Sequence, residues 1–148
     1  MSKSDNLIIG NNFCDQRGLL LYFNEFDLTP IKRFYIIEHF VVDVIRAWQG
    51  HKLETKWFHV MEGEFIIKIF KPDDWLNPSN VQKIETFLIK KNEMVILKIP
   101  RGYINGFKAA LPNSKLLVFS DATVSESNAD NYRFDKSLLN TWENLVDL

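Results

Sequence analysis

Apolar residues along this chain recur mostly at every second position, which is typical of half-buried β-strands rather than of helices. β-branched and aromatic residues dominate the segments 17–26, 31–45, 43–52, 56–70, 86–100 and 115–122. Glu62-Gly63 divides the fourth of these segments, Lys91-Asn92 divides the fifth, and Pro112-Asn113 precedes the last. Many short strands separated by turns predict an all-β sandwich or barrel.

The C-terminal segment 136–148 is the place where a helical spacing competes with this pattern. Its apolar residues fall on one helical face, namely Leu138, Leu139, Trp142, Leu145 and Val146. This spacing predicts a short C-terminal helix. The stretch 73–85 is too interrupted by proline and asparagine for a long helix. No repeat or linker is evident, so residues 1–148 are predicted to form a single domain.

Composition narrows the classes of function. Of the 148 residues, 46% are hydrophobic and 25% charged, which is enough apolar material for a core. The net charge of −1 argues against a nucleic-acid partner, but a few local cations can still hold a small anion. The single cysteine, Cys14, excludes an intrachain disulfide. The polar N-terminus and the lack of an apolar run of ~18 residues predict a cytoplasmic protein with no membrane partner.

Strand alternation predicts which side chains point into the barrel. Two sets share the inward faces of neighbouring strands: Ala47, Gln49 and His51, and then Lys56, Phe58 and Val60. A face that combines apolar bulk with a glutamine, a histidine and a lysine is typical of a pocket lining. Arg46 falls on the opposite face unless a bulge intervenes.

Several motifs, in order along the chain, resemble a known family. The run IKRFYIIEHFVVDVIRAWQGHK, Ile31 to Lys52, is similar to the IKR-x-Y strand and RGxHAHK element of the dTDP-sugar 3,4-ketoisomerases. KWFHVMEGEF and IPRGYINGF resemble elements of the related dTDP-4-dehydrorhamnose 3,5-epimerases, and LLVFSDA and NYRFD resemble the last strand and tail of both. The resemblance covers roughly residues 10–135. It implies a cupin-type jelly-roll barrel, usually a homodimer, that binds a nucleotide-diphosphate-linked 4-keto sugar.

The family's chemistry is the removal of a proton from the carbon beside a ketone. His51 falls on the second histidine of the HAH element and is the predicted base, since imidazole exchanges protons near neutral pH. The alternative is that His51 is only a hydrogen-bonded lining residue. Lys56 falls on the epimerase lysine that stabilises the enolate, with an ordinary surface lysine as the alternative. Gln49 stands where the family has its first histidine and cannot titrate.

Two departures favour ketone migration over epimerisation. The epimerase general acid, a tyrosine, is replaced by the run Asp121-Ala122-Thr123, and the histidine of the FAHGF element is Asn105. One base can move a ketone to the neighbouring carbon, whereas epimerisation needs a second group on the far face of the ring. Tyr35 and Tyr103 are candidates to supply a hydroxyl group, with core packing or base stacking as the alternative that we favour for each.

The same segments supply the predicted substrate contacts. Arg33, Arg46 and Arg101 are expected to hold the diphosphate, with Gln49 and Asn105 as hydrogen-bonding partners of the substrate. Metal-binding cupins use histidines and a glutamate, and here the corresponding set shrinks to Gln49, His51 and Asn105. We therefore expect no metal and no cofactor.

Two classes of function remain in competition. The first is a sugar-nucleotide isomerase or epimerase, 3,4-ketoisomerase-like, in deoxysugar or surface polysaccharide biosynthesis. The second is a catalytically inactive cupin that binds a sugar or nucleotide sugar as a recognition or scaffold module. A metal-dependent oxygenase is disfavoured because its ligands are missing.

Overall fold

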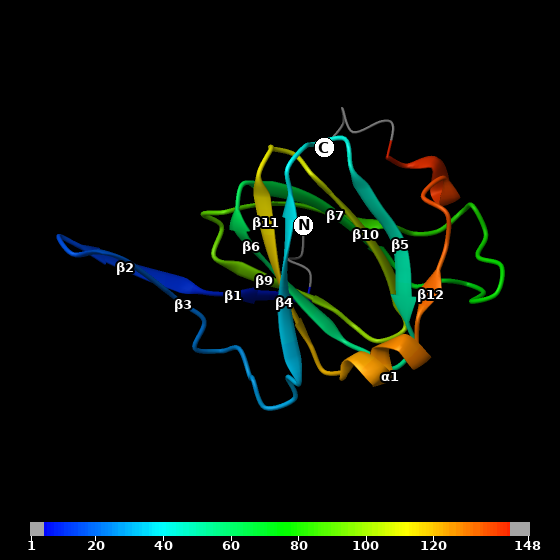
Figure 1. Cartoon of the computed structure of the whole chain (residues 1–148), viewed down its shortest axis with the longest axis horizontal. Helices are drawn as coiled ribbons and strands as arrows, with labels where there is room; N and C mark the ends of the chain where they lie inside the picture. The colour runs from blue at the N-terminus through cyan, green and yellow to red at the C-terminus, as the bar shows by residue number, and fades with distance from the viewer. Residues whose placement is uncertain (1–4, 143–148) are drawn as a thin grey trace.

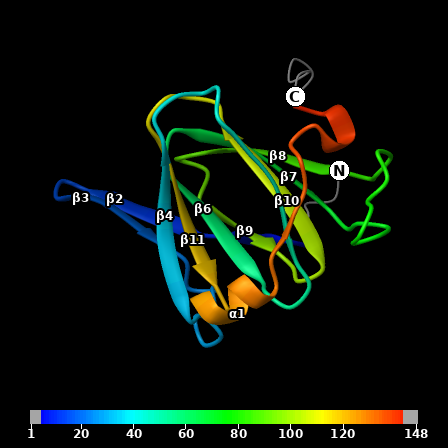
Figure 2. The same cartoon turned by 45° about the vertical axis from the view of Figure 1, so that its right-hand side comes forward.

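The computed structural model describes residues 5–142 as a nearly all-β molecule. Two five-stranded antiparallel sheets lie face to face (Figures 1 and 2). The first sheet has the order β1 (Leu7–Ile9), β9 (Val95–Ile99), β6 (Lys56–Glu62), β11 (Ser114–Ser120), β4 (Arg33–His39). The second has the order β12 (Tyr132–Arg133), β5 (Ile45–His51), β10 (Tyr103–Ala109), β7 (Glu64–Phe70), β8 (Glu85–Lys90). This confirms the predicted all-β class.

The chain crosses repeatedly from one sheet to the other, which is the jelly-roll arrangement. β6 and β7 are consecutive but lie in different sheets, and so are β8 and β9. The predicted turns at Gly63 and at Lys91-Asn92 are the crossing points. Gly63 has a φ of +71°, and a Cβ there would collide with the side chain of Ser114. Glycine is therefore required at this crossing.

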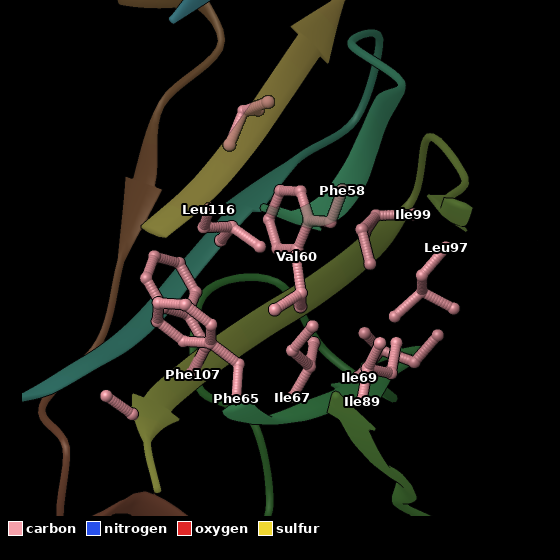
Figure 3. Close-up of a cluster of buried hydrophobic side chains, with 12 residues drawn as sticks. Phe58, Val60, Phe65, Ile67, Ile69, Ile89, Leu97, Ile99, Phe107 and Leu116 are labelled. Atoms are coloured by element: carbon pink, nitrogen blue, oxygen red, sulfur yellow. The ribbon is translucent and has the colours of Figure 1, made fainter. Parts of the chain in front are cut away.

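The apolar core fills the space between the sheets with side chains from alternate strand positions. Figure 3 shows it from within. Its buried members are Phe58, Val60, Phe65, Ile67, Ile69, Ile89, Leu97, Ile99, Phe107, Ala109, Leu116 and Val118. The period-two pattern therefore identifies the core face correctly, because successive strand residues point to opposite sides of a sheet.

A second apolar cluster covers the outer face of the second sheet. It consists of Trp48, Ile66, Phe70, Ile104 and Trp142, with residues of the C-terminal segment and of the 71–84 loop packed against them. The indole N–H of Trp48 donates to the carbonyl of Leu138 at 3.0 Å. Residues 134–142 thus pack as a layer on the sheet.

Two helical segments differ from the sequence prediction. Within the described residues, the expected C-terminal helix is a single 3-10 turn, Leu138–Asn140, in which Leu139 and Asn140 have positive φ angles. Leu145 and Val146 lie outside the described residues. The helix α1 (Val124–Ala129) was not predicted, although its capping box is a recognisable sequence signal: Thr123 and Glu126 each accept the other's backbone N–H.

The hairpin of β2 (Asn11–Asp15) and β3 (Gly18–Tyr22) projects from the body of the molecule (Figure 1). Its apolar side chains, including Phe13, Leu19 and Leu20, are more than half exposed. No helix within residues 5–142 has the length and apolar character needed to cross a membrane.

Candidate active site

A cavity of about 460 Å³ lies between the two sheets, beside the apolar core. Its apolar wall comprises Ile37, Ile45, Ala47, Trp48, Phe58, Phe107 and Val118. Its polar wall comprises Arg33, Tyr35, Arg46, Gln49, Lys56, Asn105, Ser127 and Arg133. Six of the nine site residues predicted from the sequence line this cavity: Arg33, Tyr35, Arg46, Gln49, Lys56 and Asn105. Size and lining fit a small-molecule site.

The charge of this cavity is one-sided. Three arginines and one lysine line it, and no carboxylate does so among the described residues. Arg33 is held by the carbonyl of Ala122 at 2.9 Å and by the Glu54 carboxylate at 3.4 Å. Its guanidinium lies 5.1 Å from the centre of the Tyr35 ring. Such a concentration of fixed positive charge favours an anionic ligand.

Strand register explains why Arg33 and Lys56 reach the same space. Ser120 of β11 pairs with Arg33 on one side and with Lys56 on the other. Paired residues of an antiparallel sheet point to the same face. The three side chains therefore lie side by side at the end of the sandwich where β4 begins.

Arg46 reaches the cavity through an irregularity in β5. The pairing of β10 with β5 shifts between Asn105, which faces Gln49, and Phe107, which faces Arg46. A bulge of this kind changes the face to which the following side chains point. Arg46 Nε then donates to His39 Nε2 at 2.9 Å, which fixes its orientation. The sequence pattern predicts an inward Arg46 only if a bulge intervenes, and the structure has this bulge.

Lys56 is buried at the start of β6, with 5% of its surface exposed. Its Nζ donates to Gln49 Oε1 at 3.3 Å, and Gln49 Nε2 donates to Asn131 Oδ1 at 2.9 Å. Burial lowers the pKa of Lys56 to about 8, with help from the charges of Arg33 and Arg133 and against that of Glu54. Lys56 is therefore not an ordinary surface lysine.

His51 is also buried, but it does not line the cavity. Its Nδ1 lies 2.6 Å from the carbonyl oxygen of Asp130. A carbonyl only accepts hydrogen bonds, so Nδ1 carries the proton in the neutral ring and Nε2 keeps its lone pair. No described residue hydrogen-bonds to Nε2. Burial and the nearby Lys56 charge lower the pKa of His51, so the imidazole is neutral at pH 7.

Asp130 organises the turn that links His51 to Lys56. Its carboxylate accepts the backbone N–H groups of Lys52, Leu53 and Glu54 at 3.0, 2.8 and 3.1 Å. Glu54 is buried beneath this turn, and its Oε2 accepts from Ser120 Oγ at 2.7 Å. Glu54 Oε1 lies 3.5 Å from His51 Nδ1. The turn therefore holds one negative charge close to the two titratable groups.

The other two predicted residues lie elsewhere. Tyr103 pairs with His51 across β10 and β5 and packs against the apolar core. Arg101 is exposed, and its Nη2 lies 3.6 Å from Asp121 Oδ2 at a separate pocket of about 400 Å³. Tyr35 is the phenol that lines the main cavity among the described residues, and burial raises its pKa.

Sequence reasoning missed two cavity residues, Arg133 in β12 and Ser127 in α1. Arg133 belongs to the NYRFD motif, so an arginine between two aromatic residues was a usable signal. Ser127 lies in the helix that was not predicted. No group of three His, Cys, Asp or Glu side chains placed to hold a metal ion occurs among residues 5–142.

The chain resembles known proteins in sequence and in fold. It is 28% identical over 111 residues to a probable low-salt glycan biosynthesis epimerase, Agl13, of Haloferax volcanii, an alignment that covers 70% of this chain and 68% of that protein. No family model matches the sequence.

Solved structures resemble it over almost its whole length. The rmlC epimerase of Mycobacterium tuberculosis gives a TM-score of 0.74 at 14% identity, covering 96% of this chain and 76% of that one. A TDP-quinovose 3,4-ketoisomerase of Campylobacter jejuni gives 0.68 at 19% identity, covering 90% and 95%. The H51N mutant of the 3,4-ketoisomerase QdtA of Thermoanaerobacterium thermosaccharolyticum, in complex with TDP-4-keto-6-deoxyglucose, gives 0.66 at 22% identity, covering 93% and 94%. The chain therefore has the jelly-roll fold of the dTDP-sugar epimerases and ketoisomerases that its sequence motifs resemble.

Proposed function

We propose that this chain is an enzyme that isomerises a nucleotide-linked 4-keto sugar, in deoxysugar or surface polysaccharide biosynthesis. The observation that carries the proposal is the cavity with three arginines, a buried lysine and no carboxylate among its described lining residues. A diphosphate offers oxygen atoms that match paired guanidinium N–H groups. Two proteins of similar fold support the same substrate class: a dTDP-4-dehydrorhamnose 3,5-epimerase with TDP bound, and the QdtA H51N mutant with TDP-4-keto-6-deoxyglucose bound.

Ketone migration between C4 and C3 is the reaction that fits best. Epimerisation needs an acid on the far face of the ring, but Asp121 accepts the backbone N–H of Thr55 at 2.8 Å and lies outside the cavity. Tyr35 is the one phenol among the described lining residues. A single base that takes a proton from C3 and returns it to C4 is sufficient for ketone migration.

Two groups compete for the role of this base. His51 is the base predicted from the sequence, and its Nε2 lone pair is free of any described partner. Lys56 lines the cavity directly. Both are neutral, or close to it, under mildly alkaline conditions. A histidine or a lysine abstracts a proton only in its unprotonated, neutral form.

Incubation with dTDP-4-keto-6-deoxyglucose in deuterated water tests the proposal. We expect a 3-keto product, with deuterium at the carbon that gains the proton, followed by NMR. Lys52→Met is a matched control, because Lys52 is an exposed cation outside the cavity. Inversion of configuration at a carbon beside the ketone, with the ketone still at C4, would show epimerisation in place of isomerisation. TDP binding without deuterium exchange would favour a recognition module over an enzyme.

A recognition module is the second candidate function. The substitution of Gln49 at a family histidine position and the placement of His51 outside the cavity lining favour it. Such a module would still need the three arginines to bind the diphosphate. Calorimetry with TDP and with the keto sugar nucleotide, combined with the exchange experiment, separates the two functions.

We also propose that the chain forms a homodimer. An isolated two-stranded hairpin is marginally stable in water, yet β2–β3 exposes Phe13, Leu19 and Leu20. β4, at the edge of the first sheet, exposes Phe34 and Ile36. Apolar patches of this kind mark interfaces. Sedimentation velocity is expected to give a dimer that Leu20→Lys dissociates. A wild-type chain that sediments as a monomer at 100 µM, about a hundredfold above a 1 µM dissociation constant, contradicts the proposal.

A further inference from the structure

The cavity lining contains one described side chain that can take up and release a proton near neutral pH. A guanidinium group does not act as a base in proteins, which excludes the arginines of the lining. Burial raises the pKa of Tyr35 above its ordinary value of 10.0, so its phenol remains protonated. The amide and hydroxyl side chains of the lining do not act as bases. Lys56 is what remains.

We propose that Lys56 is the catalytic base that carries the proton between the two sugar carbons, a role that the sequence assigns to His51. This inference rests on the proposed isomerase function and names the group that performs it. It also differs from the enolate-stabilising role that the resemblance implies for Lys56. A lysine that acts as a base has to be neutral when it takes the proton, whereas a lysine that stabilises an enolate has to be positively charged.

The contacts of Lys56 suit a neutral amine. Its Nζ has one hydrogen-bond partner among the described residues, Gln49 Oε1, at 3.3 Å. An amide oxygen only accepts, so the amine donates one N–H to it and keeps its lone pair for another direction. Gln49 is itself held by Asn131. A histidine at position 49 would compete for the substrate proton, whereas a glutamine only orients the amine.

The surroundings of Lys56 disfavour a further positive charge. Burial is the largest effect, and Arg33 and Arg133 act in the same direction. One buried carboxylate, Glu54, opposes them, and Ser120 and Arg33 already occupy its Oε2. The charged and titratable groups that face the amine come from every neighbouring element: Arg33 and Tyr35 from β4, Arg46 and His51 from β5, Glu54 from the turn, and Arg133 from β12.

His51 is placed less well than Lys56 to act on the substrate. The ring does not line the cavity, and Nδ1 is committed to the Asp130 carbonyl. Its neutral form places a polar but uncharged group beside the amine.

The proton balance needs no other reactant. The amine takes the proton from C3, and the C–H electron pair forms the C3=C4 double bond while O4 becomes an enolate. The ammonium, which now holds this proton among its three, delivers one of the three to C4, and the hydroxyl proton of O3 moves to O4. In deuterated water the other two positions of the ammonium carry solvent deuterons, so deuterium appears at C4. One C–H and one O–H bond break and one of each forms, so the ketone moves from C4 to C3 without net oxidation.

The pH dependence of kcat/KM distinguishes the two bases, because it reports the free enzyme. A Lys56 base gives a kcat/KM that rises with pH through an inflection near 8, where the amine loses its proton. A His51 base, whose pKa is lowered from 6.5, gives full activity throughout the neutral range. A profile that is flat between pH 7 and pH 9 overturns the inference.

Two substitutions separate a base from a fixed charge. Lys56→Arg keeps the positive charge but cannot act as a base, and Lys56→Met removes both. We expect each to lower deuterium exchange by about 10²-fold or more. If Lys56 only stabilised the enolate, Lys56→Arg would keep a substantial part of the activity that Lys56→Met loses. His51→Asn retains a donor toward the Asp130 carbonyl and is expected to lose less than about tenfold.

Lys68→Met is the matched control for a buried lysine. Lys68 is also 5% exposed, but it lies outside the cavity and donates to Thr141 on the outer face of the second sheet. Circular dichroism shows whether each variant is folded. Wild-type exchange that survives in Lys56→Arg or is lost equally in His51→Asn overturns this inference alone. A wild-type chain without exchange at any pH overturns the proposed function and the inference together.

Discussion

The space between the two sheets has two halves that differ in content. β7, β8 and β9 contribute only apolar side chains to it, and none of their residues lines the cavity. β4 and β5 line the cavity with arginines, while β6 and β10 serve both halves: β6 supplies Lys56 to the cavity and Val60 to the core. Alternation decides whether a side chain points inward, and position along the strand decides which half it enters.

The two halves of this space contribute differently to the protein. The apolar half stabilises the fold through close packing. The charged half concentrates cations that a packed core would not tolerate without an anion or water. Substitutions in the two halves should therefore separate stability from binding.

The largest expected effect concerns the apolar half. Leu97 is fully buried in β9, so Leu97→Ala should lower the free energy of unfolding by about 2–5 kcal/mol, through lost burial and the space left behind. Urea unfolding measures this change. Titration with TDP at a temperature where the variant is folded should give an unchanged dissociation constant. A large loss of affinity would show that the two halves are not separable.

Next in size is the pH dependence that Lys56 gives to stability. The folded protein releases the Lys56 proton at about pH 8, whereas the unfolded chain holds it up to about 10.5. Between these values the unfolded state binds more protons, so the free energy of unfolding rises with pH. The rise amounts to roughly 3 kcal/mol.

Lys56→Met isolates this contribution, because every other group titrates in both proteins. Urea unfolding of both at pH 7.5 and pH 10 should give a larger increase for the wild type. Equal increases in the free energy of unfolding would mean that the surroundings of Lys56 do not destabilise its ammonium form.

A smaller effect is expected for nucleotide binding at the edge of the cavity. Arg133 is exposed in β12, so Arg133→Ala should change stability little but weaken TDP binding by about 10- to 100-fold, as expected for a lost charged hydrogen bond. Isothermal titration calorimetry measures both affinity and stoichiometry. Undiminished binding would exclude Arg133 from the diphosphate site.

The smallest effect is expected for Arg101, which lies at the separate pocket near Asp121. Arg101→Ala should weaken TDP binding less than Arg133→Ala does. The reverse order would favour the diphosphate contact that the sequence predicts for Arg101.

Much of the fold follows from local patterns. The alternation through 56–62 places Phe58 and Val60 correctly in the core, and Gly63 marks a turn that only glycine fits. The C-terminal segment was harder, because its apolar spacing fits a helix, whereas its described residues, 136–142, form turns and one 3-10 turn that pack on the second sheet. Its packing on Trp48 is a tertiary effect.

The lining of the cavity could be predicted where motifs and strand alternation place the residue, as for Lys56 and Gln49. It was not predictable where it depends on long-range register. The inward turn of Arg46 needs a bulge that no local residue announces, and Arg133 belongs to a strand of two residues. The position of His51 depends on Asp130, which lies 79 residues away in the sequence.

β5, together with its neighbour β10, separates the cavity from the outer cluster, and residues 134–142 pack against the outer side of β5. Trp48 exchanges backbone hydrogen bonds with Phe134 at 3.0 and 3.1 Å and packs against Trp142. A chain shortened to residue 133 would keep every lining side chain of the cavity, yet it would lose these contacts. The shape of the cavity therefore depends in part on residues 134–142, although none of them lines it, and we expect deletions of these residues to disturb it.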